Sequence, residues 1–173
     1  PHVAVITAVE KAHIGFLGSL DAIADEKAAI LQGLQPKGVA VLPADTPLLS
    51  RLRDAAGDAR IVTFGMATHA DVRLLDLSMD AEGSDVTAAF AGEQLHFRLH
   101  APGQHMAINA LAAIAAAMML ADARPEPIVR ALKDFAPVAG RGARRRIFGP
   151  TQQPPASVRR RRPVLPHVWP IGP

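Results

Sequence analysis

Three short apolar runs near the beginning of the chain, separated by segments typical of helices, limit its fold more than any other feature. The runs cover residues 3–7, 39–42 and 61–64 and are rich in Val and Ile. Continuous apolar runs of this length indicate strands that are buried on both faces of a sheet. Strands that alternate with helices favour right-handed βαβ units, so we predict an α/β fold with a mostly parallel sheet flanked by helices.

Helix signals lie between these runs. Ser19 can cap a helix that continues to about residue 34, before Gln35-Pro36 stops it. Thr46-Pro47 supplies the cap residue and the first-turn proline of a second helix, which we expect to reach about residue 56.

Residues 72–100 follow a different pattern. Short strand-like segments surround the turn residues Ala91-Gly92, as in antiparallel strands that end in a hairpin. We expect this antiparallel region to be appended to the parallel sheet. Helices are predicted next, over about 104–120 and 125–135.

The charge of the chain is divided unevenly. Residues 1–134 hold 11 Lys or Arg and all 16 Asp or Glu, a balance of −5, whereas residues 135–173 hold 8 Lys or Arg and no acid. The net charge of +3 therefore does not indicate a basic, nucleic-acid-binding body. Residues 149–173 contain 7 of the 15 prolines and the run Arg159 to Arg162, so we predict disorder there.

Composition excludes several classes of protein. The chain has no cysteine, which rules out disulfides and thiolate metal sites. No apolar run approaches the roughly 18 residues that a membrane-spanning helix needs, and the first residues lack the pattern of a signal peptide. We expect a soluble, cytoplasmic, monomeric protein without a membrane partner.

Two residues near the first strand could bind a metal ion. His13 follows the carboxyl end of that strand, where open α/β sheets place their sites, although a single histidine there is more often a solvated loop residue. Lys27 lies on or beside the apolar stripe of the first helix. It either extends to solvent or, as a neutral amine, reacts with carbon dioxide to form a carbamate that suits Mg²⁺.

Two further segments could bind a nucleotide. His105 and Asn109 are four residues apart on a helix, so an amide that reads a base edge and an imidazole share one face. The alternative is a polar start to an alanine-rich core helix. Arg141, after Gly140, can bind phosphate through its guanidinium group, or it belongs to the solvated basic run that follows.

Together these segments resemble the Mur ligases, the ATP-dependent amide-forming enzymes of peptidoglycan precursor synthesis. The resemblance covers about residues 1–148, and it implies the member type that adds D-alanyl-D-alanine to UDP-N-acetylmuramoyl-tripeptide. The matching segments are Ala12-His13, Gly18-Ser19, Ile23-Ala24, Lys27-Ala28-Ala29-Ile30, Gly103-Gln104-His105, Asn109-Ala110-Leu111-Ala112-Ala113 and Gly140-Arg141.

The resemblance implies a role for each candidate residue. His13 would ligate Mg²⁺, a carbamylated Lys27 would hold the same metal region, His105 and Asn109 would line the adenine pocket, and Arg141 would reach the phosphates. ATP would phosphorylate the terminal carboxylate of the UDP-linked tripeptide, and the amine of D-alanyl-D-alanine would then displace phosphate. Nucleic acid is not an expected partner.

The chain departs from the family pattern in several places. Ala8 and Met106 stand where many relatives have asparagine, and no G-x-x-x-x-G-K-[ST] phosphate loop occurs in the sequence. We predict a partial central ATP-binding domain over 1–136, an inter-domain linker over 137–148 and the tail over 149–173. We expect this arrangement to come from a truncated gene product. Its tail would be read out of frame, and the chain would have no activity alone.

Two alternatives remain open at this point. One is another Mur or folylpolyglutamate-type ligase, which the short spacer between His13 and Lys27 disfavours without excluding. The other is a non-enzymatic α/β body whose Arg-rich tail binds nucleic acid or acidic surfaces, with an affinity that would fall steeply as salt is added.

Overall fold

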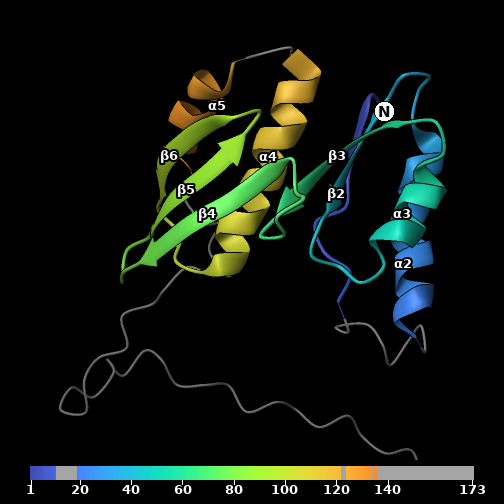
Figure 1. The fold of residues 1–173 in the computed structure, drawn as a ribbon, viewed down its shortest axis with the longest axis horizontal. Coiled ribbons are helices and arrows are strands. Elements are labelled where there is room, and N and C mark those ends of the chain that lie inside the picture. Colours follow the sequence, from blue (N-terminus) through green and yellow to red (C-terminus); the bar gives the residue numbers. More distant parts are fainter. Residues whose placement is uncertain (11–18, 122–123, 134, 136–173) are drawn as a thin grey trace, which may run out of the picture. The chain divides into compact units, whose positions relative to one another are not determined.

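A computed structural model describes residues 1–10, 19–121, 124–133 and 135. Its six strands form one sheet in the order β1-β2-β3-β4-β5-β6 (Figure 1). The strands are β1 (Val3–Val5), β2 (Val39–Pro43), β3 (Arg60–Gly65), β4 (Val72–Met79), β5 (Ser84–Phe90) and β6 (Glu93–Leu99). The helices are α2 (Leu20–Ala28), the 3₁₀ helix η2 (Ala29–Gly33), α3 (Leu49–Ala56), α4 (Gln104–Ala121) and α5 (Pro125–Leu132).

The first half of the sheet is parallel, as the sequence predicts. β1 pairs with β2, β2 with β3, and β3 briefly with β4, all in the parallel sense. Every residue of β2 is buried, with Val39 and Val41 in the core beneath α4 and Ala40 and Leu42 in the core beneath α2 and α3. Helices therefore cover both faces of this half, which explains why its strands are apolar without alternation.

The second half is antiparallel, which confirms the predicted appended region. β4 pairs with β5 and β5 with β6, and the register of β4 shifts between Leu74 and Asp76. Ala91 and Gly92 form the β5–β6 hairpin with φ angles of 50° and 85°, the left-handed conformation that such turns require. Apolar residues of this half pack against α4 and α5.

The predicted first helix is divided in two. Ser19 caps it as expected, because its Oγ accepts a hydrogen bond from the backbone N–H of Ala22 at 3.1 Å. The α-helix ends at Ala28, however, and η2 continues to Gly33 as a tighter helix. The short 3₁₀ segment lies just before Gln35-Pro36, where the proline disfavours helical geometry in the preceding residue.

Two other helix boundaries differ from the prediction. α3 begins at Leu49 because Thr46 Oγ1 accepts a hydrogen bond from the N–H of Leu48 at 3.3 Å, and so closes a local turn before the helix. α5 ends at Leu132 rather than near residue 135. Within the described ranges, no helix has both the length and the apolar character needed to cross a bilayer.

Candidate functional site

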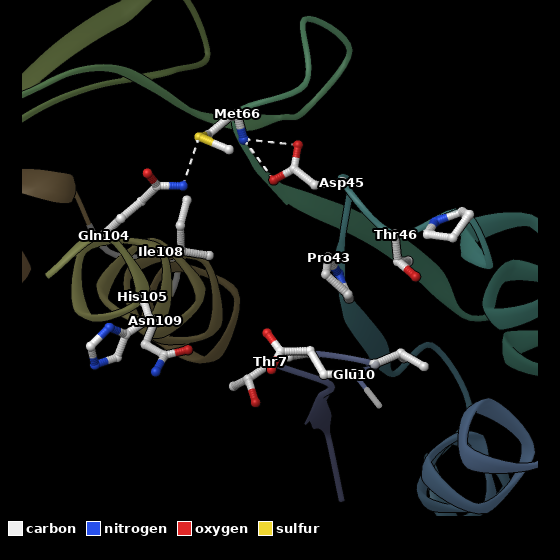
Figure 2. Close-up of a pocket in the computed structure, with 13 residues that line it drawn as sticks. Thr7, Glu10, Pro43, Asp45, Thr46, Met66, Gln104, His105, Ile108 and Asn109 are labelled. Atoms are coloured by element: carbon white, nitrogen blue, oxygen red, sulfur yellow. Dashed lines mark hydrogen bonds between the residues drawn. The ribbon is translucent and has the colours of Figure 1, made fainter. Parts of the chain in front are cut away.

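A cavity of about 520 Å³ lies at the carboxyl ends of β1, β2 and β3 (Figure 2). The first turns of α4 form one of its walls. Its lining residues are Thr7, Ala8, Val9, Glu10, Pro43, Asp45, Thr46, Pro47, Met66, Gln104, His105, Ile108 and Asn109. Open α/β sheets bind their ligands at this edge, because the loops that follow parallel strands converge there.

The α4 wall combines polar and apolar side chains. Gln104, His105 and Asn109 are exposed and Ile108 is half-buried. Figure 2 shows Ile108 pointing toward Met66 and Gln104, and the Asn109 amide extending on the side of Thr7. The helix begins after Gly103, whose φ of 127° is a conformation that L residues rarely adopt. A Cβ at this position would lie 2.8 Å from His105 Cε1, so the exposed imidazole ring would have to shift.

The opposite wall is fixed by the Asp45 carboxylate, which follows β2. Its Oδ1 and Oδ2 accept hydrogen bonds from the N–H of Met66 at 3.1 and 2.9 Å, and Oδ1 also accepts one from the N–H of Ala67 at 2.7 Å. The carboxylate thus satisfies two backbone donors where the chain leaves β3. Gln104 Nε2 approaches Met66 Sδ at 3.2 Å, so α4 also contacts this wall.

The structure brings two of the five predicted site residues together. His105 and Asn109 both line the cavity, on one side of α4. Lys27 is half-buried in the last turn of α2 and is not among the residues that line the cavity. His13 and Arg141 lie outside the described residues, so their roles stay predictions, as does the magnesium site that His13 and Lys27 would share.

Sequence reasoning missed the residues that the ends of β2 and β3 contribute. Asp45 and Met66 are 21 positions apart, and neither belongs to a recognisable spacing motif. Their position directly after two apolar runs was the available signal, because residues that follow parallel strands meet at one edge of the sheet.

The lining of the cavity suits a nucleoside. Its volume lies within the range of small-molecule sites, roughly 300–1,000 Å³. Ile108, Met66 and Val9 give it apolar surface, and the Asn109 amide provides both a donor and an acceptor. Glu10 adds a carboxylate of the kind that Mg²⁺ binds. Among the described residues, no three His, Asp or Glu side chains gather closely enough to hold a metal ion.

The half-parallel sheet and the position of the cavity define an α/β domain with its candidate ligand site at the carboxyl edge of the parallel strands. The chain belongs to the Mur ligase family, since the model of the Mur ligase middle domain matches residues 1–117. This confirms the family that the sequence resembles.

Individual relatives agree with this assignment. The UDP-N-acetylmuramate--L-alanine ligase of Methylobacterium sp. (strain 4-46) is 36% identical over 149 residues, which cover 82% of this chain and 31% of that ligase. The UDP-N-acetylmuramoyl-tripeptide--D-alanyl-D-alanine ligase of Bacillus subtilis (strain 168) is 38% identical over 116 residues, 67% of this chain and 24% of that ligase.

The fold agrees as well. The crystal structure of MurF from Acinetobacter baumannii matches with a TM-score of 0.75 and 29% identity, and the match covers 81% of this chain and 30% of that one. The chain therefore spans less than a third of the length of these relatives.

Proposed function

We propose that this chain supplies the adenine-binding part of an ATP-dependent ligase that forms an amide bond in peptidoglycan precursor synthesis. The observation that carries the proposal is the position of Asn109 and His105 on one wall of the cavity at the carboxyl ends of β1 to β3. The sequence assigns these residues to the adenine pocket through the family resemblance alone. Their place in a cavity of suitable size supports that assignment on geometric grounds.

In this proposal, the residues of α4 bind the base. Asn109 offers an amide to its edge, and Ile108 supplies apolar surface beside it. Binding at the base end places the phosphates of ATP for reaction without requiring chemistry from these side chains.

In the proposed reaction, a carboxylate oxygen of the UDP-linked peptide attacks the γ-phosphorus of ATP and ADP leaves. The incoming amine then attacks the carbonyl carbon of the acyl phosphate and loses a proton, and inorganic phosphate departs. Mg²⁺ would neutralise charge on the transferring phosphoryl group. We assign His13 and a carbamylated Lys27 to that ion and Arg141 to the phosphates, as the family resemblance implies.

For the amino component we propose D-alanyl-D-alanine, added to UDP-N-acetylmuramoyl-tripeptide. The Ala12-His13 pair, its spacing to Lys27 and the 38% identity to the Bacillus subtilis ligase support this choice. A second candidate is the addition of L-alanine to UDP-N-acetylmuramate, which is favoured by 36% identity to the Methylobacterium ligase over 82% of the chain.

Nucleotide binding tests the first part of the proposal. Thermal unfolding of the full chain is measured with ATP, with CTP and without nucleotide. We expect ATP to raise the midpoint more than CTP, and Asn109→Ala to abolish the difference. Gln94→Ala, at an exposed amide on β6, is the matched control. Equal midpoints with and without ATP in the wild type would overturn the proposal.

An exchange of the segment that matches the family model tests which amino component the ligase adds. Residues 1–117 replace the corresponding segment of the Bacillus subtilis ligase in one chimera and of the Methylobacterium ligase in another. Release of ADP is measured with the substrates of each parent. Activity in the first chimera alone supports the addition of D-alanyl-D-alanine, and activity in the second alone supports the addition of L-alanine.

A further inference from the structure

Met66 is an exposed apolar side chain at the edge of the cavity. It follows β3 directly, and 47% of its surface is exposed although the last four residues of the strand are buried. Packing therefore covers only part of this side chain. The backbone of Met66 is held separately, because its N–H donates hydrogen bonds to the Asp45 carboxylate.

Two side chains, those of Asp45 and Gln104, hold this part of the chain. The Asp45 carboxylate accepts the N–H groups of Met66 and Ala67, and Gln104 Nε2 contacts Met66 Sδ. Gly65 precedes Met66 with a φ of 147°, and a Cβ at that position would overlap the Asp45 carboxylate. The close approach of Asp45 therefore requires glycine at position 65.

The side chain of Met66 completes an apolar surface inside the cavity. Ile108 points toward it from α4, and Asn109 lies one residue further along that helix (Figure 2). A thioether is polarizable and packs well against aromatic rings. Met66 and Ile108 thus offer a surface for a planar ring, next to an amide that can read the edge of that ring.

We propose that Met66 packs against the base of the bound nucleotide and that Asp45 is the positioning residue that holds Met66 there. The inference rests on the proposed function, because it takes the ligand of the cavity to be an adenine nucleotide. Both oxygens of Asp45 already accept backbone hydrogen bonds, which favours a positioning role over direct binding of a cation.

Methyl spectra of the protein test the contact directly. The chain has five methionines, so ¹³C-methyl labelling gives five signals, and the loss of one in Met66→Ala assigns Met66. Adenosine without metal ions is the probe. We expect saturable upfield movement of the Met66 signal from the ring current of the base, while Met79, exposed on β4, does not respond.

Affinity measurements test the role of Asp45. We expect Met66→Ala to weaken adenosine binding roughly threefold to tenfold, the range of a thioether–aromatic contact, and Met79→Ala to leave it unchanged. Asp45→Ala should weaken binding similarly, but not further when Met66 is already alanine. Asp45→Asn retains an oxygen that can accept hydrogen bonds from the N–H groups of Met66 and Ala67, so this variant should bind adenosine with about the affinity of the wild type.

The outcomes separate the two proposals. Binding of adenosine with an unmoved Met66 signal overturns this inference and leaves the proposed function intact, whereas absence of any adenosine or ATP binding removes both. An additive effect of Asp45→Ala in the Met66→Ala background contradicts the positioning role. The free energy of unfolding of each variant, measured in urea, shows whether lost binding reflects an unfolded protein.

Discussion

Thr63 and Asp71 form a reciprocal hydrogen-bonded pair across the connection between β3 and β4. Asp71 Oδ2 accepts hydrogen bonds from the N–H and the hydroxyl of Thr63, both at 2.7 Å, and Thr63 Oγ1 accepts one from the N–H of Asp71 at 3.1 Å. Thr63 is 1% exposed. The pair closes the base of the loop that carries Met66, so it stabilises the same wall of the cavity that Asp45 positions.

Replacing Thr63 tests this closure. Thr63→Val keeps the shape of the side chain but leaves the Asp71 carboxylate without its hydroxyl donor. Because the lost hydrogen bond involves a charged acceptor, we expect the free energy of unfolding to fall by about 1.5–3 kcal/mol. Urea unfolding measures the change. Thr68→Val, at an exposed threonine of the same loop, is the control, and an equal loss in both variants would contradict the assignment.

Gly65 offers a second test of the same wall. Gly65 and Gly57 both have positive φ angles, 147° and 55°, but only at Gly65 would a Cβ meet another group, the Asp45 carboxylate. We expect Gly57→Ala to cost about 1–3 kcal/mol of unfolding free energy from backbone strain alone, because its φ of 55° and ψ of −125° form a conformation that L residues rarely adopt. Gly65→Ala should cost more and should also weaken adenosine binding, because Asp45 must move away from Met66. If the two variants changed the free energy of unfolding and the affinity for adenosine equally, the role of Gly65 beside Asp45 would be refuted.

The sheet could be predicted from the sequence because its signals are local. β2 and β3 are continuous apolar runs between turn residues, and the structure extends each by only one or two positions. The hairpin was also predictable from Gly92, because glycine readily adopts the left-handed conformation that the turn needs, whereas the positive φ of Ala91 has no such signal in the sequence. Helix ends were less predictable, because the hydrogen bond of Thr46 to Leu48 competes with its expected role as a helix cap.

Only part of the candidate site was predictable, for a physical reason. His105 and Asn109 share a face through helical periodicity, which sequence spacing reveals. The contact of Asp45 with Met66 depends instead on the parallel register of β2 and β3, which places Pro43 opposite Phe64. A register of this kind follows from packing of the whole sheet and leaves no short-range pattern in the sequence.

Acidic pH should weaken the turn between β4 and β5. The Arg98 guanidinium, together with the N–H groups of Glu82 and Gly83, lowers the pKa of Asp80 from 3.8 to about 2. A carboxyl with a lowered pKa stabilises the folded state fully above its unfolded value, and this contribution disappears as the pH falls through its folded value. Stability linked to Asp80 should therefore decline as the pH falls from 3.8 to about 2.

Asp80→Asn isolates the contribution of the charge. Oδ1 of Asp80 accepts the N–H groups of Glu82 and Gly83, both at 2.8 Å, and an asparagine oxygen can do the same. Oδ2 of Asp80 accepts a hydrogen bond from Arg98, and in Asp80→Asn this interaction loses the negative charge of the carboxylate. Unfolding midpoints of wild type and Asp80→Asn should differ at neutral pH, approach each other as the pH falls from 3.8, and converge below pH 2. Asp76→Asn, at another exposed carboxylate of β4, is the control, and a difference that does not narrow over this range would contradict the linkage.

Lys27 provides a test of the proposed metal chemistry. It lies in the last turn of α2, half-buried, between exposed Glu26 and buried Ala28. If it forms a carbamate that binds Mg²⁺, labelled bicarbonate together with Mg²⁺ should produce one carbamate ¹³C signal per chain. The signal should vanish in Lys27→Ala, and it should persist in Lys37→Ala, whose lysine is exposed in a turn. A signal that survives in Lys27→Ala, or none in the wild type, would mean that Lys27 extends its amine to solvent and covers apolar surface with its methylene groups.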